Sequence, residues 1–190
     1  MTGRWQMVAA LTLCVAIFSV NWTVLNAAGS IITSELGLTP ATEVMLAYAF
    51  PVALLGVLIP VKGRLSVLLW GLAGFGLMSA AGAFAVNGGM LVACRFGQGL
   101  ASAIVLRAGF ELARTHLRGA TWWPAVAIPA VVALVGLNAG PVIGGVISQY
   151  LSFRWNLLVC VPLTVVAVVA VALFTPRTRP APETRTDLSG

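Results

Sequence analysis

An all-α integral membrane protein with six transmembrane helices is the fold class that this sequence predicts. Of the 190 residues, 59% are hydrophobic and only 8% are charged, and the mean hydropathy is +1.00. The apolar residues gather in six long runs, each near the roughly 20 residues that one membrane crossing needs. A soluble domain of this length does not bury so much apolar surface, so the surrounding medium must be a lipid bilayer.

The six predicted spans follow one another with short connections, as in a compact helical bundle. They cover residues 7–29, 44–61, 67–86, 90–112, 125–147 and 155–174.

Separate features of the sequence support the first span, the connections between spans and the final segment. The first is too long, and too polar near its end, for a cleavable signal peptide, so we expect a true span. A tight basic loop joins the second and third spans, and the Asn-Gly-Gly turn at 87–89 joins the third and fourth. A longer stretch at 113–124 separates the fourth and fifth, and its Trp122 and Trp123 fit an interfacial belt better than a ligand site. The Pro-, Arg- and Thr-rich segment 175–190 is predicted to be a disordered cytoplasmic tail.

The positions of the charged residues predict the orientation. If six spans alternate, one side of the membrane receives nearly all the basic loop and tail residues: Arg4, Lys62, Arg64, Arg114, Arg118, Arg177, Arg179 and Arg185. The other side receives Glu35, Glu43 and Arg154. By the positive-inside rule this predicts a multi-pass protein of the cell membrane with both termini in the cytoplasm. The net charge of +6 therefore reflects orientation, and no nucleic-acid partner is expected.

Nothing in the sequence indicates an enzyme, a metal site or a cofactor. Cys14, Cys94 and Cys160 lie within predicted spans without metal-ligand spacing, so we interpret them as small buried residues. His116 is the only histidine, and no zinc-protease, redox or phosphate-binding motif is present.

The segment GLNAGPVIGG in the fifth span carries a stripe of small residues. Gly136, Gly140 and Gly144 are spaced at four, so they share one helix face, and Gly145 follows. Such stripes let two helix backbones approach closely in lipid. Pro141 removes one backbone donor, so we expect a bend beside the stripe. The helix is predicted to pack against a neighbour or to move against it.

Arg95 is the one charged residue placed inside a predicted span and away from its ends. A charge there costs about 2.5–3.5 kcal/mol on insertion scales, so it should face a partner or a water-filled cavity. The alternative is that its side chain reaches toward the outer headgroups. Gln98 lies three residues on, so both side chains can point to the same side.

Other polar residues at membrane depth leave two interpretations open. Each could form a hydrogen bond between helices, or the set could line a cavity for amphipathic organic molecules. This set comprises Asn21, Trp22, Asn26, Tyr48 and Asn138. Arg107 and Glu111, at i and i+4, are predicted to form a local ion pair.

Several of these segments together resemble the major facilitator superfamily, in its fourteen-span drug:proton antiporter branch. GLNAGPVIGG is similar to the antiporter signature, and Arg95-Phe-Gly-Gln98-Gly99 is similar to the R-x-x-Q-G motif. The stretch from Asn21 to Ala27 resembles L-D-x-T-x-x-N-x-A, and Phe153-Arg154-Trp155 with Pro162 resembles the entry to the sixth span. A fifth match is the loop motif G-x-L-a-D-r-x-G-R, which corresponds to Gly56, Lys62, Gly63 and Arg64.

The resemblance implies the amino-terminal six-helix half of a transporter, built from two three-helix repeats. It implies export of small amphipathic compounds or drugs by proton antiport, with Arg95 helping to couple protons to substrate. Since such transporters have twelve or fourteen spans, activity would need a homodimer or a second six-span half, and the glycine stripe is the expected contact face.

Two departures weaken that expectation. The acidic position of the loop motif is Pro60 here, and that of the first span is Asn21. A non-transporting remnant, or a regulatory membrane protein, is the alternative.

Overall fold

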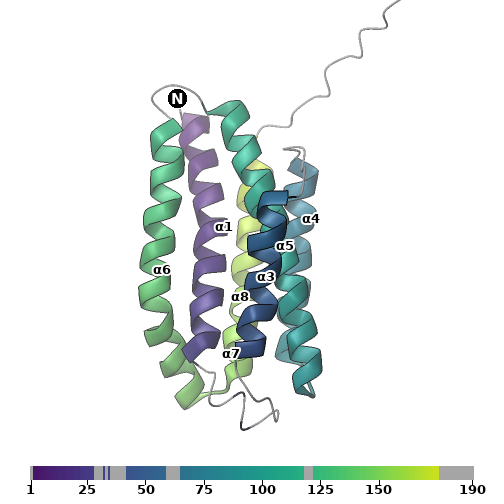
Figure 1. Cartoon of the computed structure of the whole chain (residues 1–190). Helices are drawn as coiled ribbons and strands as arrows, with labels where there is room; N and C mark the ends of the chain where they lie inside the picture. The colour runs from purple at the N-terminus through teal and green to yellow at the C-terminus, as the bar shows by residue number, and fades with distance from the viewer. Residues whose placement is uncertain are drawn as a thin grey trace, which may run out of the picture.

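The chain folds as a bundle of roughly parallel and antiparallel helices (Figure 1). The computed structural model describes residues 2–27, 32, 34, 42–58, 65–117 and 122–175, and these ranges contain helices and no strand. The helices are α1 (Thr2–Ala27), α3 (Thr42–Leu58), α4 (Leu65–Ala83), α5 (Gly88–His116), α6 (Trp122–Tyr150), α7 (Phe153–Leu158) and α8 (Cys160–Phe174). The predicted all-α class is confirmed.

The helices overlap the six predicted spans, with different ends. Five stretches are long and apolar enough to cross a membrane: Gly3–Thr23, Leu65–Ala83, Gly88–His116, Trp122–Ile147 and Phe153–Phe174. The remaining helix, α3, is a shorter apolar segment of 17 residues that stands beside them in the bundle. The first helix starts at Thr2, five residues before the predicted 7–29.

The connection between the fourth and fifth spans is shorter than the predicted 113–124. Helix α5 continues to His116, and α6 begins at Trp122. Arg114 and His116 occupy the last turn of α5, where cations are favourable at the negative end of the helix dipole. Trp122 packs edge-on against Phe110, with ring centroids 5.9 Å apart. This contact lets α6 start one turn earlier than its apolar pattern suggests.

The sixth span, Phe153–Phe174, is interrupted at the single residue Val159 between α7 and α8, where we expected one helix over 155–174. Pro162 has no backbone donor, and it lies in the first turn of α8, where a donor would have no partner inside the helix. At the break, Ser79 Oγ of α4 donates to the Leu157 carbonyl at 3.0 Å. Arg154 Nη1 donates to the Ala83 carbonyl at the end of α4, at 2.8 Å. These two bonds tie α7 to α4.

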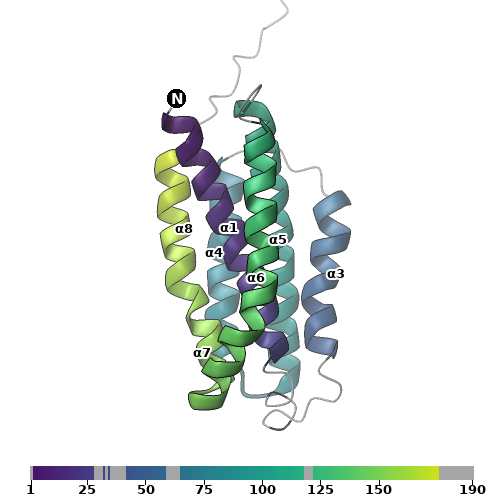
Figure 2. The ribbon, with the colours of Figure 1, turned by 90° about the vertical axis from the view of Figure 1, so that its left-hand side faces the viewer.

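The packing order is symmetric between the two halves of the chain. Helix α1 packs most extensively on α6, and α3 packs on α5. Helices α4 and α8 pack on each other, and α4 also packs on α5 while α8 also packs on α1. Exchanging the first three spans with the last three preserves these partnerships, as two three-helix repeats require. The start of α1 and the end of α8 lie at the same end of the bundle (Figures 1 and 2).

The glycine stripe of α6 faces α1 of the same chain. A Cβ atom at Gly136 would lie 2.9 Å from Ser19 Cβ, and one at Gly140 would overlap the Thr23 side chain. Thr23 Oγ1 also donates to the Gly136 carbonyl at 3.2 Å. The expectation that this stripe contacts a second transporter half is therefore wrong, because α1 already occupies it. Gly144 is also buried, whereas a Cβ atom at Gly145 would have no neighbour within 4 Å.

Replacing Gly140 with Ala should destabilise the α1–α6 pair. The new methyl group would collide with Thr23, and overpacking of this kind costs about 1–3 kcal/mol. Gly145→Ala is the matched control in the same helix and should leave stability unchanged or slightly raised. Thermal unfolding in mild detergent measures both variants. Equal melting temperatures for the two would contradict the close α1–α6 approach.

Candidate functional site

An apolar cavity of about 370 Å³ lies between the α1–α6 pair and the α3–α5 pair. Its walls carry Phe18 and Trp22 from α1, Tyr48 and Val52 from α3, Leu106 from α5 and Leu137 from α6. Nearly all of the lining is hydrophobic or aromatic, as in sites that bind small organic molecules.

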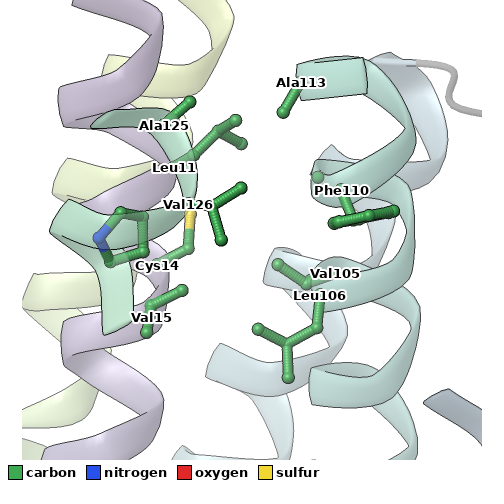
Figure 3. A pocket seen from close by; sticks show the side chains of 11 residues that line it. Leu11, Cys14, Val15, Val105, Leu106, Phe110, Ala113, Ala125 and Val126 are labelled. Carbon is green, nitrogen blue, oxygen red and sulfur yellow. The ribbon is translucent and has the colours of Figure 1, made fainter. Parts of the chain in front are cut away.

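A second apolar cavity of about 180 Å³ continues the first toward the end of the bundle that holds the N-terminus. Figure 3 shows Leu11 and Val126 on one side, facing Phe110 and Leu106 on the other. Val15 and Leu106 line both cavities. The two cavities therefore form one apolar groove between the helix pairs, called the groove below.

A group of buried polar side chains lies beside the groove. Its members come from three helices and are called the Arg95 cluster: Asn21 of α1, Tyr48 of α3, and Arg95, Gln98 and Ser102 of α5. Arg95 is only 2% exposed and Gln98 is fully buried. The Arg95 side chain thus stays inside the bundle, and the alternative that it reaches the outer headgroups is wrong.

The cluster is organised around Tyr48. Its hydroxyl lies 2.9 Å from Ser102 Oγ, and Ser102 Oγ in turn donates to the Gln98 carbonyl at 2.8 Å. The Arg95 guanidinium carbon lies 5.7 Å from the Tyr48 ring centroid, in a cation–π arrangement. Asn21 Oδ1 accepts a weak hydrogen bond from Cys160 Sγ of α8 at 3.6 Å.

Several polar atoms of the cluster lack a hydrogen-bond partner among the described residues. They are Arg95 Nε and Nη2, Gln98 Nε2 and Oε1, and Asn21 Nδ2. A buried polar atom without a partner costs about 1–3 kcal/mol, and more when it is charged. In the described part of the chain the recorded salt bridge joins Arg107 to Glu111 at 3.0 Å, so no described carboxylate neutralises Arg95.

The spacing of the α5 residues explains how the cluster forms. Arg95, Gln98 and Ser102 fall at i, i+3 and i+7, which places them on one helix face. Gly99 lies between them, and a Cβ there would overlap the Tyr48 carbonyl. The absent side chain at Gly99 therefore lets α3 approach α5 and brings Tyr48 over Arg95.

Three participants were not predicted as site residues: Gly99, Ser102 and Cys160. Gly99 was part of the R-x-x-Q-G motif, and the i, i+7 relation of Ser102 to Arg95 was a usable signal. Cys160 gave no such signal, because its contact with Asn21 joins residues 139 positions apart.

The other predicted site residues are placed in different ways. Trp22 is half-buried and its ring lies 5.6 Å from that of Tyr48, so it joins the groove wall. Asn138 is exposed on α6 and donates to the Leu134 carbonyl of its own helix at 2.7 Å, so it is not part of the cluster. Asn26 lies in α1, but its side chain is outside the described residues. The predicted Arg107–Glu111 ion pair is confirmed.

Most of the loop motif cannot be placed. Gly56 lies near the end of α3, whereas Lys62, Gly63 and Arg64 lie outside the described residues, as do Pro60 and 176–190 of the predicted tail. Among the described residues, no three His, Cys, Asp or Glu side chains gather as a metal site would need.

Replacing Gly99 with Ala should separate α3 from α5 and loosen the Arg95 cluster. The added methyl group meets the rigid Tyr48 backbone, so we expect a loss of about 1–3 kcal/mol in stability and faster amide exchange in α3. Gly74→Ala is the control, since its Cβ would lie 3.9 Å from Ala101 Cβ, an ordinary contact. Hydrogen exchange read by mass spectrometry makes the comparison, and unchanged α3 protection in Gly99→Ala would refute the assignment.

Comparison with known proteins relates the chain to membrane transporters. It is 33% identical over 205 residues to the cephamycin export protein CmcT of Amycolatopsis lactamdurans, covering 100% of this chain and 42% of that protein. It is 38% identical over 128 residues to the lincomycin resistance protein of Streptomyces lincolnensis, covering 67% of this chain and 26% of that protein. It is 28% identical over 198 residues to the puromycin resistance protein pur8 of Streptomyces alboniger, covering 98% of this chain and 39% of that protein.

The chain spans less than half the length of these relatives. The family model of the Major Facilitator Superfamily matches residues 11–190, which is nearly the whole chain. With the helical bundle and its apolar groove, this match establishes that the chain belongs to the major facilitator superfamily of membrane transporters.

Proposed function

We propose that the chain is the amino-terminal half of an exporter of small amphipathic compounds, driven by proton antiport. The observation that carries this proposal is the groove, with the Arg95 cluster behind its Tyr48 wall. An amphipathic molecule needs an apolar surface for its body and a polar group for its head, and this face of the bundle offers both.

The names of the relatives support the substrate class. They are described as a cephamycin export protein, a lincomycin resistance protein and a puromycin resistance protein. Each name refers to an antibiotic, and the groove offers such a compound an apolar surface.

The coupling role is proposed for Arg95, with Gln98 beside it. Arg95 is the arginine of the R-x-x-Q-G motif. Its charge is buried, so gaining or losing an oppositely charged partner would strongly change the free energy of the charged side chain. Asn21 cannot carry a proton in place of the acidic residue of the first-span motif. A side chain that takes up and releases the proton would therefore have to lie at a position other than 21.

Transport by alternating access requires a second bundle. Transporters of this kind rock one bundle against another around a site at the membrane midplane, and we propose that the groove faces that second bundle. The second bundle would be another copy of this chain or a separate six-helix half. This assignment replaces the glycine stripe as the contact face, since the stripe is filled by α1.

We place the protein in the cell membrane with both termini in the cytoplasm. Arg4 at the start of α1 and Arg114 at the end of α5 belong to the end of the bundle that holds the N-terminus. The positive-inside rule assigns that end to the cytoplasm.

The alternative function is a non-transporting membrane protein that regulates a partner. Pro60 stands where the loop motif has its acid, so the ion pair that such an acid could form is missing. This alternative retains the groove as a surface for another membrane protein.

Replacing Arg95 with Gln should abolish proton-driven efflux from proteoliposomes that contain the chain. The charge is removed while a polar side chain of similar reach remains. Arg107→Gln is the control in the same helix, because Arg107 is paired locally with Glu111 outside the cluster. Efflux of a fluorescent amphipathic dye under an imposed pH gradient gives the readout. Efflux by Arg95→Gln at the rate of the unmodified chain would remove the coupling role. If the unmodified chain gives no efflux either alone or with a second half, the non-transporting alternative holds.

If two copies face each other across the groove, a cysteine at Leu137 should cross-link between copies. Leu137 lines the groove and is 41% exposed. Trp70→Cys is the control, since Trp70 is exposed on α4 and does not line the groove. Both variants are made after Cys14, Cys94 and Cys160 are replaced by Ala. Mass measurement in mild detergent gives the oligomeric state, and equal cross-linking at both positions would contradict an interface at the groove.

A further inference from the structure

The Arg95 cluster has more hydrogen-bond donors than acceptors. Of its five unpartnered atoms, four are N–H groups and one is the oxygen of Gln98. The donors come from α1 and α5 and from three side chains, so they do not belong to one local motif. A buried group of donors with a positive charge is suited to an acceptor that carries a negative charge.

The described residues do not supply that negative charge. Of the two carboxylates in the described helices, Glu111 is paired with Arg107, and Glu43 is exposed at the start of α3. The Tyr48 ring face stabilises the guanidinium by cation–π attraction, but a ring is a weak acceptor and does not replace the oxygen acceptors that Nε and Nη2 would have in water. The site is therefore electrostatically incomplete within the described part of the chain.

We infer that the Arg95 cluster binds the carboxylate of a small organic anion whose apolar body lies in the groove. Arg95 offers the planar fork that matches two carboxylate oxygens, and Gln98 and Asn21 offer further donors. This deepens the proposed function by naming amphipathic carboxylates as the substrate class, and it rests on that function.

Tyr48 forms the wall between the two parts of the site. Its ring lines the groove on one side and faces Arg95 on the other. A carboxylate reaches Arg95 when the Tyr48 side chain turns aside, and that movement breaks the bond to Ser102 Oγ. Tyr48→Phe removes this bond, so it should speed the binding of the anion while keeping Arg95 in place.

The test measures binding to the detergent-solubilised chain by equilibrium dialysis, with naphthalene-2-carboxylate and naphthalene-2-carboxamide as probes. The two probes have the same apolar body and differ in charge. We expect the carboxylate to bind at least about tenfold more tightly, as for one charge-assisted hydrogen-bond pair. Arg95→Gln should bring the two affinities together by weakening binding of the carboxylate more than that of the carboxamide, whereas Arg107→Gln should keep the difference.

A second variant tests the same site in case Arg95→Gln does not fold. Gln98→Leu replaces buried polar atoms that have no partner with an apolar side chain of similar size, so thermal stability should stay equal or rise. Carboxylate affinity should nevertheless fall several-fold. A purely structural role for Gln98 would leave the affinity unchanged.

The outcomes separate this inference from the proposed function. Equal binding of both probes by the unmodified chain, or a carboxylate preference that survives in Arg95→Gln, overturns the anion site even if dye efflux is intact. A carboxylate preference that depends on Arg95 supports the site even if efflux fails, because dialysis needs neither a pH gradient nor a second half.

Discussion

Close approach of helix backbones is the constraint on which the rest of this structure depends. In a bilayer, apolar side chains gain nothing from leaving the lipid, so helices associate through packing and hydrogen bonds. Gly136 and Gly140 of α6 let α1 come close enough for Thr23 to donate a hydrogen bond to the Gly136 carbonyl. Gly99 of α5 likewise lets the backbone of α3 approach α5. The tight α1–α6 and α3–α5 pairs leave the groove between them. Without these contacts there would be neither a groove nor a wall for the Arg95 cluster.

The cluster holds a charge that no carboxylate among the described residues neutralises. Polar atoms of Arg95, Gln98 and Asn21 that have no partner in the described part of the chain lower stability. Interhelical contacts elsewhere offset this cost, among them the Ser79–Leu157 and Arg154–Ala83 bonds that join α4 to the broken sixth span. Most of the unpartnered buried atoms among the described residues belong to the Arg95 cluster. Each such group in a native structure calls for an explanation.

Much of the architecture could be predicted from the sequence, because membrane spans depend on long apolar runs. Five of the six predicted spans overlap helices long and apolar enough to cross a membrane, and the other overlaps the shorter helix α3. Arg95 and Gln98, at the i, i+3 spacing, are both buried. The partner of the glycine stripe could not be predicted, since a pattern of small residues names no neighbour. The break at Val159 was missed because hydropathy continues through it, and only Pro162 marked it. The contact between Asn21 and Cys160 required the fold itself, as 139 residues separate them.

The symmetric pairing of the helices has a consequence for the order in which the protein is assembled. Helices α3 and α4 both pack on α5, so these three helices can pack together as they are synthesised. Within this bundle, the main partner of α1 is α6, which begins about 95 residues after α1 ends, and the contacts of α1 with α8 come later still. Until then, Asn21 and Thr23 lack their final partners. Of the described helices, the earliest in the chain is therefore among the last to acquire its native contacts.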